Sequence, residues 1–197
     1  MCRCFEGADP QNLCFCQAIT GFVLLQASTV LNLVALFAPS WLMDNENNKQ
    51  QIVLGLWAKC EGNCQWSVTP VEGGWLRACQ VLMCASAVGW VTASWLGWTK
   101  VCSAAYRRSY ATNAYIITAI ILAGCFAITV AIVFGVEGPK QVRQLFPGKT
   151  SLGWTYILIV VSICSGAVSC ILYGLEGLAI KRSMRGYFEI TESGNYY

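Results

Sequence analysis

Four long stretches of this 197-residue chain carry no charged side chain, and they limit its fold more than any other feature. A helix needs about 20 mostly apolar residues to cross the hydrocarbon core of a bilayer. Only a helix can satisfy its own backbone there, because a lone strand would leave its polar groups unpaired. The charge-free stretches cover 10–43, 78–99, 109–136 and 150–175. Within them we predict transmembrane helices near 18–37, 78–98, 114–136 and 152–174.

The composition agrees with a protein whose main partner is the lipid bilayer. Only 12% of the residues are charged, whereas a soluble domain has about 25%. The net charge of +3 is too small to indicate nucleic-acid binding. We therefore predict one all-α four-helix membrane bundle. Its predicted parts are an N-terminal tail at 1–17, a four-span unit at 18–175 with connections at 40–77, 99–113 and 137–151, and a C-terminal tail at 176–197.

The orientation of the bundle follows from its charges and its cysteines. Four spans place both termini on the same side. The short connection at 99–113 holds three basic residues and no acidic one, which favours the cytosol. Cys60 and Cys64 lie in the longest polar connection, and a disulfide persists only on the oxidising side of a membrane. We predict a multi-pass plasma-membrane protein with both termini in the cytosol.

The polar connection at 40–77 is expected to form a small extracellular antiparallel sheet. The segment 51–60 predicts a strand with Ile52, Leu54 and Leu56 on one face and Val53, Gly55 and Trp57 on the other. Residues 61–63 contain a glycine and predict a hairpin turn. The return strand at 64–69 then places Cys64 opposite Cys60. Opposed residues are close enough for a disulfide to clip the hairpin. Two free thiols in a turn are the alternative.

Small residues recur at every fourth position in three of the spans. Such positions share one helix face, and small faces allow helix backbones to approach closely in lipid. The simple abundance of small residues is the alternative explanation. The first span carries Gln26 and Asn32 instead, whose amides are expected to face the bundle interior. The three series are Ala85, Gly89, Ala93 and Gly97; Ala119, Ala123, Ala127 and Ala131; and Ser162, Gly166, Cys170 and Gly174.

A set of residues in the polar connection resembles the signature of the claudin superfamily. That signature has a tryptophan after the first span, then Gly-Leu-Trp, then two cysteines. The helix entry at 74–83 and the pair Gly153-Trp154 are also similar to claudin segments, so the resemblance covers nearly the whole chain. The matching residues are Trp41, Gly55, Leu56, Trp57, Cys60 and Cys64.

The resemblance implies a left-handed four-helix bundle that carries an extracellular β-sheet. It also implies homo-oligomers within one membrane and adhesion to same-family proteins of the opposite cell.

Three features depart from the claudin pattern. Only three residues separate the two cysteines. Gln80 stands where relatives carry arginine, and Arg77 is the candidate substitute. The chain ends in Tyr196-Tyr197, which argues against binding to PDZ scaffold domains.

In claudins the charges of the first loop select the ions that pass between cells. Here the loop has four acidic and two basic residues, which predicts a mild cation preference if they line a pore. A solvated hydrophilic loop is the alternative. The candidate charges are Asp44, Glu46, Lys49, Lys59, Glu61 and Glu72, with Arg77 at the helix entry.

The second connection contains an apolar patch. Leu145 and Phe146 precede a proline, and Trp154 follows at the start of the last span. In the family this loop contacts partners. The physics of the patch fits either an interface anchor or a tip that dips into the membrane.

Cysteines near the predicted inner leaflet are candidates for lipid modification. Cys14, Cys16 and Cys102 lie at the inner ends of the first two spans, where S-acylation is common. The N-terminal tail has two further cysteines, so a zinc site and free thiols are the alternatives. The acylation prediction is preferred because the spacing is unusual for zinc, and no metal site is assigned.

The sequence offers no catalytic constellation. It contains no histidine, and its carboxylates are scattered over the connections. Glu176 is expected at the membrane interface near Lys181 and Arg182, and no buried ion pair is expected within the spans. We therefore predict a non-enzymatic protein without a cofactor. The preferred hypothesis is a cell-junction protein that forms a paracellular barrier or an ion-selective pore. The alternative is an auxiliary subunit of an ion channel or receptor.

Overall fold

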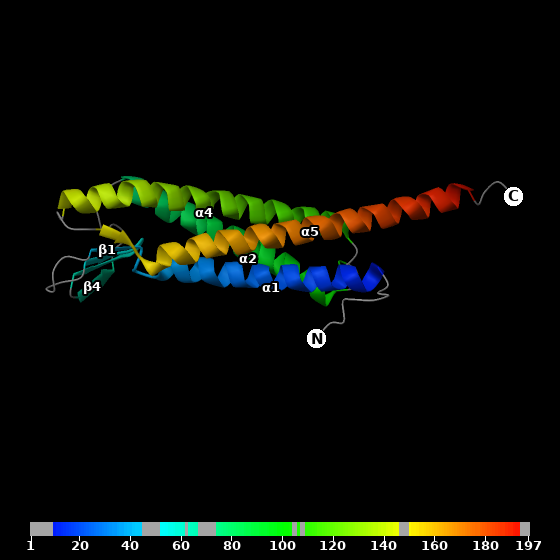
Figure 1. Cartoon of the computed structure of the whole chain (residues 1–197), viewed down its shortest axis with the longest axis horizontal. Coiled ribbons are helices and arrows are strands. Elements are labelled where there is room, and N and C mark those ends of the chain that lie inside the picture. Colours follow the sequence, from blue (N-terminus) through cyan, green and yellow to red (C-terminus); the bar gives the residue numbers. More distant parts are fainter. Residues whose placement is uncertain are drawn as a thin grey trace.

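Four long helices lie side by side, and a small sheet covers one end of the bundle that they form (Figure 1). The computed structural model describes residues 10–44, 52–61, 63–66, 74–103, 106, 109–145 and 150–193. The first helix, α1 (Pro10–Phe37), begins at the end opposite the sheet. The last, α5 (Trp154–Ser193), ends there too, as an even number of spans requires.

The four predicted spans are confirmed. The bundle is completed by α2 (Gly74–Cys102) and α4 (Tyr110–Leu145). Among the described residues, four segments are long and apolar enough to cross a membrane, and they overlap the predicted spans. These segments are Gln17–Phe37, Gly74–Cys102, Tyr110–Lys140 and Trp154–Arg182.

Several helices extend further than hydropathy predicts. The helix α4 passes through Pro139 and ends at Leu145, so most of the connection predicted at 137–151 is helical. The predicted tail at 176–197 is helical as far as Ser193. The helix α1 already begins at Pro10, a residue type that the first turn of a helix accepts without losing a hydrogen bond. The helices extend beyond the predicted spans because apolar patterning shows where lipid contact ends, and a helix can continue beyond that point.

Each helix packs mainly against two neighbours, in the order α1, α2, α4, α5 around the bundle. Consequently α2 and α5 lie diagonally opposite each other. The predicted small-residue faces of α2 and α4 are confirmed, because a Cβ at Gly89 would lie 2.8 Å from the Cβ of Ala123. The face of α5 is confirmed only in part. Gly166 leaves room for the Trp90 ring, whereas a Cβ at Gly174 would meet nothing within 4 Å.

Hydroxyl and amide groups tie α1 to the other helices. Asn32 is fully buried, as predicted, and donates from Nδ2 to Ser86 Oγ of α2 at 3.4 Å. Gln26 is only half-buried. On the other side of α1, Ser162 Oγ of α5 donates to the carbonyl of Ser28 at 2.8 Å, and Ser169 Oγ donates to the carbonyl of Gly21 at 2.7 Å. Polar groups therefore bond between helices instead of facing lipid.

The sheet has five antiparallel strands in the order β4-β3-β2-β1-β5. The predicted register of the hairpin is confirmed, since Cys60 pairs with Cys64 and Ala58 with Trp66. The first predicted strand, 51–60, is wrong because 55–57 interrupt it. The turn is also shorter than predicted, since Glu61 pairs with Asn63. The strands are β1 (Leu42–Asp44), β2 (Ile52–Leu54), β3 (Ala58–Glu61), β4 (Asn63–Trp66) and β5 (Thr150–Leu152).

One hydrophobic core joins the sheet to the bundle. Leu42 and Leu54 of the sheet are buried in the same cluster as Leu76 of α2 and Phe134 of α4. A second cluster, around Trp90 and Tyr173, fills the bundle toward the end opposite the sheet. The sheet is therefore packed onto the helices as part of a single unit.

Candidate functional site

The signature tryptophan, Trp41, connects the sheet to the first helix. Its indole is fully buried, and Nε1 donates to the carbonyl of Ala35 at the end of α1 at 2.9 Å. Its backbone nitrogen donates to Leu54 at 3.0 Å, and its carbonyl accepts from the nitrogen of Gly153 at 2.8 Å. The ring also lies 4.8 Å from that of Phe134, measured between centroids. One residue thus links α1, β2, α4 and the beginning of α5.

The Gly-Leu-Trp motif forms the bend between β2 and β3. The nitrogen of Gly55 donates to the carbonyl of Ala58 at 2.8 Å and closes the bend. A Cβ on Gly55 would lie 2.6 Å from the Cα of Pro39, so no larger residue fits without moving the backbone. Leu56 is fully buried and Trp57 is half-buried. The motif therefore fastens the bend to the bundle.

Gln80 of α2 binds the backbone of this bend. Its side chain is buried in α2, and Nε2 donates to the carbonyl of Leu56 at 2.7 Å. Arg77, expected to substitute for the arginine of relatives, is instead exposed on α2. Arg77 lies on the stripe of α2 that includes exposed Val81 and Cys84, whereas Gln80 lies on the buried stripe with Leu76 and Met83. The polar contact to the motif is made by Gln80 itself.

Replacement of Gln80 by leucine should destabilise the protein by about 1–3 kcal/mol, because the buried carbonyl of Leu56 would lose its donor. The free energy of unfolding, measured by denaturant titration in detergent, tests this. Gln65→Leu is the matched control, since Gln65 is exposed on β4. An equal loss in the two variants would contradict the assigned role of Gln80.

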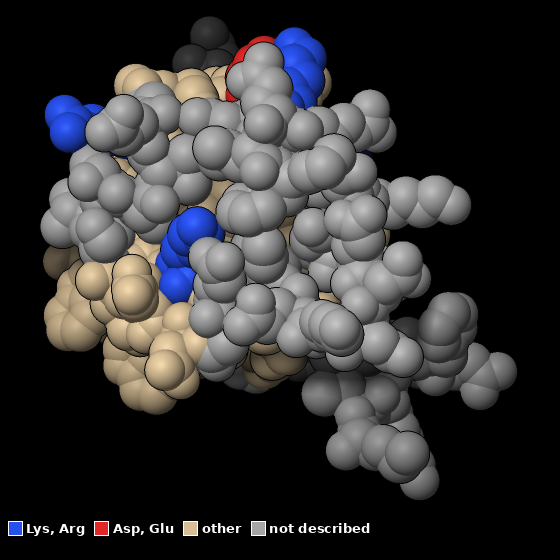
Figure 2. Space-filling view, turned by 90° about the vertical axis from the view of Figure 1, so that its left-hand side faces the viewer, with Lys and Arg blue, Asp and Glu red and all other residues tan. Residues whose placement is uncertain are grey.

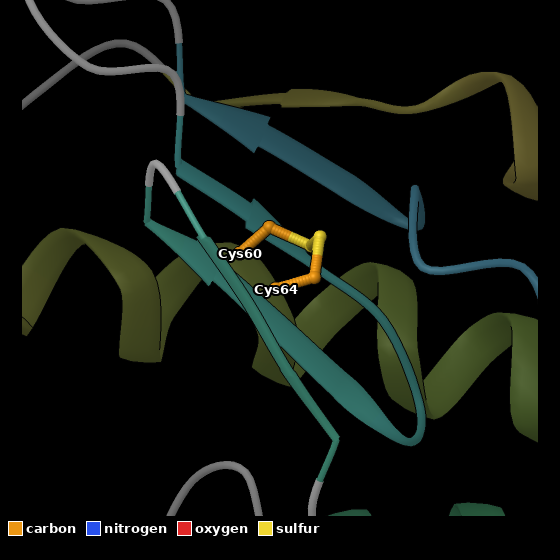
Figure 3. Close-up of a disulfide and its surroundings, with 2 residues drawn as sticks. All are labelled: Cys60 and Cys64. Carbon is orange, nitrogen blue, oxygen red and sulfur yellow. A yellow bond between two sulfur atoms is a disulfide. The ribbon is translucent and has the colours of Figure 1, made fainter.

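The two signature cysteines form a disulfide between β3 and β4 (Figure 3). Their Cα atoms are 3.9 Å apart. Cys60 is buried, whereas Cys64 is exposed on the edge strand β4. The pairing agrees with the predicted hairpin, and it rigidly connects the outermost strand to its neighbour.

The structure describes only part of the predicted loop charges. Lys59 is half-buried on β3 opposite Gln65, and Arg77 is exposed. Asp44 and Glu61 are placed only by their backbones, in β1 and β3, and Glu46, Lys49 and Glu72 lie outside the described residues. Seen end-on from the sheet side, the described basic side chains lie apart from one another (Figure 2). The charges of the described part therefore form no continuous patch on this face.

The second connection contributes a strand that the sequence reasoning missed. The strand β5 pairs with β1, and Ser151 lies opposite Met43. Gly153 follows it, and a Cβ there would collide with the carbonyl of Ser40. The predicted interface residues are not gathered into one patch by the described part. Leu145 ends α4, Phe146 lies outside the described residues, and Trp154 is exposed at the first position of α5.

The three cysteines predicted to be acylated lie at the end of the bundle opposite the sheet. Cys102 is a free, exposed thiol at the end of α2. Cys14 and Cys16 lie in the first turns of α1, and their side chains are outside the described residues.

The prediction that the spans hold no buried ion pair is wrong. Lys100 of α2 and Glu176 of α5 are buried and pair at 2.5 Å. Glu176 was expected at the interface near Lys181 and Arg182, and Lys100 in a connection. In the sequence, a lone lysine and a lone glutamate stand at the ends of two apolar spans. That pattern indicates an ion pair only once the two helices are known to lie close together.

Comparison with known proteins adds one finding. A family model described as tight junction protein, claudin-like matches residues 13–181. No curated protein matches the chain significantly.

Proposed function

The chain belongs to the claudin-like family of tight junction proteins, and from this premise we propose that it works at contacts between cells. In this proposal the sheet faces the extracellular space, both termini lie in the cytosol, and the protein is delivered to the plasma membrane. Copies associate side by side in one membrane and bind same-family proteins of the opposite cell. The resulting assembly limits or selects the ions that pass between the cells.

The observation that carries the proposal is the outer edge of the sheet. The strand β4 is an edge strand, and all four of its residues are exposed. They include Trp66, whose side chain is 63% exposed. An exposed edge strand with a large aromatic residue is a ready template for pairing with another chain. A second copy of this protein, offering the same edge, is the proposed partner.

The disulfide supports the same proposal because it prepares this edge for binding. Cys64 lies within β4 and is linked to Cys60 of the anchored strand β3. An edge that is already ordered loses less conformational entropy on association. The core below it, built from Leu54, Leu56 and Trp41, holds the whole sheet on the bundle.

Ion selection is proposed to depend on the acidic excess of the first loop. Four acidic and two basic residues lie between residues 44 and 72. If they line the path between cells, they raise the local concentration of cations. The second-loop residues Leu145, Phe146 and Trp154 are proposed to add apolar contacts with partners. Acylation of Cys14, Cys16 and Cys102 is proposed to anchor the cytosolic side in the inner leaflet.

One observation favours a second candidate function, that of an auxiliary subunit of an ion channel or receptor. The hairpin between β3 and β4 closes within a single residue, since β3 ends at Glu61 and β4 begins at Asn63. A turn this short projects little beyond the sheet, which suits lateral contact with a neighbouring membrane protein. Purification in mild detergent distinguishes the two functions, because an auxiliary subunit retains a channel or receptor in fixed stoichiometry.

The junction proposal is tested by expressing the protein in epithelial cells that lack junctions. Enrichment at cell–cell contacts and a changed transepithelial conductance are the expected results. Diffuse surface staining together with unchanged conductance would overturn the proposal.

The double variant Cys60→Ser with Cys64→Ser should lose surface delivery or adhesion while inserting normally into the membrane. Releasing this short loop should cost about 2 kcal/mol, which loosens the sheet but leaves the helices intact. Surface biotinylation and contact enrichment measure the effect. Cys125→Ser with Cys164→Ser is the matched control, since these are free, exposed thiols of α4 and α5. Normal delivery and adhesion of the first variant would refute the proposed role of the disulfide.

A further inference from the structure

A cluster of four polar or charged side chains fills the interior of the bundle at the end opposite the sheet. Lys100 of α2 donates from Nζ to Glu176 Oε2 of α5 at 2.5 Å and also to Oδ1 of Asn113 of α4. Asn113 Nδ2 in turn donates to the carbonyl of Tyr173 at 3.4 Å. The Lys100 nitrogen lies 5.3 Å from the centre of the Tyr173 ring. All four residues are no more than 3% exposed.

The position of this cluster within the membrane segments makes it costly to disrupt. Both charged residues belong to segments that are apolar enough to span a bilayer, Gly74–Cys102 and Trp154–Arg182. Removing either partner would leave the other charge buried and unpaired, which is strongly destabilising. The exposed pair of Lys140 and Glu137 on α4 is different, because solvent already surrounds both groups.

The pair joins two helices, α2 and α5, that are not neighbours in the bundle. Since α2 and α5 lie diagonally opposite each other, the Lys100–Glu176 contact crosses its centre. Apolar helix faces without a polar contact specify the alignment of two helices less strictly. A single buried polar contact, in contrast, defines one alignment, as buried polar residues do in coiled coils.

The N-terminal ends of α2 and α5 lie next to the sheet, at the end of the bundle opposite the ion pair. The helix α5 begins directly after β5 and Gly153, while α2 begins beyond β4 and holds the Leu56 bend through Gln80. From Trp154 to Glu176 the helix rises about 33 Å. A slip of α5 by one turn would displace β5 along β1 by about 5 Å, more than one residue of strand register.

We propose that the Lys100–Glu176–Asn113 cluster is a transmembrane register lock. It fixes the alignment of α5 with α2 at one end of the bundle and thereby positions β5 against β1 at the other. The order of the sheet on one side of the membrane thus depends on a charge pair near the opposite side. This inference rests on the fold alone and holds whether the protein acts at junctions or as an auxiliary subunit.

A disulfide between β1 and β5 reports the register directly. Met43 and Ser151 are paired across these strands, and Ser151 Oγ donates to the Met43 carbonyl at 3.3 Å. In the full-length protein, Met43→Cys with Ser151→Cys should cross-link during synthesis into microsomes. Mass spectrometry of the linked peptides gives the fraction formed, and surface delivery is not required.

The cross-linked fraction should fall about fivefold or more when the double-cysteine protein also carries Lys100→Met or Glu176→Gln. Each of these substitutions leaves a buried charge without its partner. The exchanged pair, Lys100→Glu with Glu176→Lys, should restore most of the cross-linked fraction. Lys140→Met, which breaks the exposed pair, should leave it unchanged.

Three results would overturn the lock. The first is full cross-linking in both single variants. The second is an exchanged pair that remains as low as the single variants, which would mean that the two residues act separately. The third is an equal loss in Lys140→Met, which would mean that the reporter responds to any lost ion pair.

Discussion

Replacement of Trp41 by alanine is expected to lower the free energy of unfolding by about 3–5 kcal/mol. The indole is fully buried between α1, the sheet and Phe134, so its removal leaves a large cavity. The carbonyl of Ala35 also loses the donor at Nε1. Since Trp41 joins the sheet to the bundle, the sheet should loosen first. Denaturant titration in detergent gives the stability, and limited proteolysis of the intact protein locates the loosened segment.

Trp66→Ala is the matched control for this prediction. Trp66 is the same residue type in the same sheet, but its side chain is 63% exposed. Its removal should change the stability of the isolated protein by no more than about 0.5 kcal/mol. If both variants lost a comparable amount of unfolding free energy, the burial of Trp41 between the sheet and the bundle could not be the cause of the effect.

The parts of this fold that are local in sequence were predictable. Charge-free length alone located the four spans, because the bilayer sets the length of a crossing helix. The hairpin register was also correct, since pairing Cys60 with Cys64 across a short turn follows from counting residues along two strands. The small-residue faces of α2 and α4 followed from helical periodicity.

The parts that depend on distant contacts were not predictable in the same way. The strand β5 is three residues long and exists because it pairs with β1, more than 100 residues earlier. Gly55 was predicted as part of a continuous strand, yet it lies in a bend closed by its bond to Ala58 and packed against the backbone of Pro39. Propensity and alternation carry no information about such neighbours.

In the candidate site, too, local sequence features were predictable and contacts between distant residues were not. The signature residues were found from their order in the sequence, and Trp41 and Leu56 prove to be buried anchors. Arg77 was expected to substitute for the arginine of relatives, but it is exposed, and the buried Gln80 makes the polar contact with the motif. The position on the helix face decides which residue makes this contact. Lys100 was assigned to a connection and Glu176 to the membrane interface for a related reason. Hydropathy treats a charge as the end of a span and cannot show that its partner lies on another helix.

The second large effect is expected at Gly166, where the Trp90 ring of α2 lies against the backbone of α5. A Cβ at this position would overlap the ring, which is itself almost fully buried and has no free direction in which to move. Gly166→Val should therefore push α5 away from α2 across the bundle centre. The expected loss of stability is about 3 kcal/mol or more, at the upper end of overpacking effects.

Gly174 supplies the control on the same helix, because a Cβ there would meet nothing within 4 Å. Gly174→Val should change the free energy of unfolding by less than about 1 kcal/mol, since it adds only a small difference in helix propensity. If the collision with the ring is the cause at Gly166, shortening Trp90 must relieve it. The double variant Trp90→Leu with Gly166→Val should then be more stable than the sum of the two single losses predicts, by about 1–3 kcal/mol. Strictly additive losses, or equal losses at Gly166 and Gly174, would show that Gly166 is required for a reason other than the fit of Trp90 across the bundle.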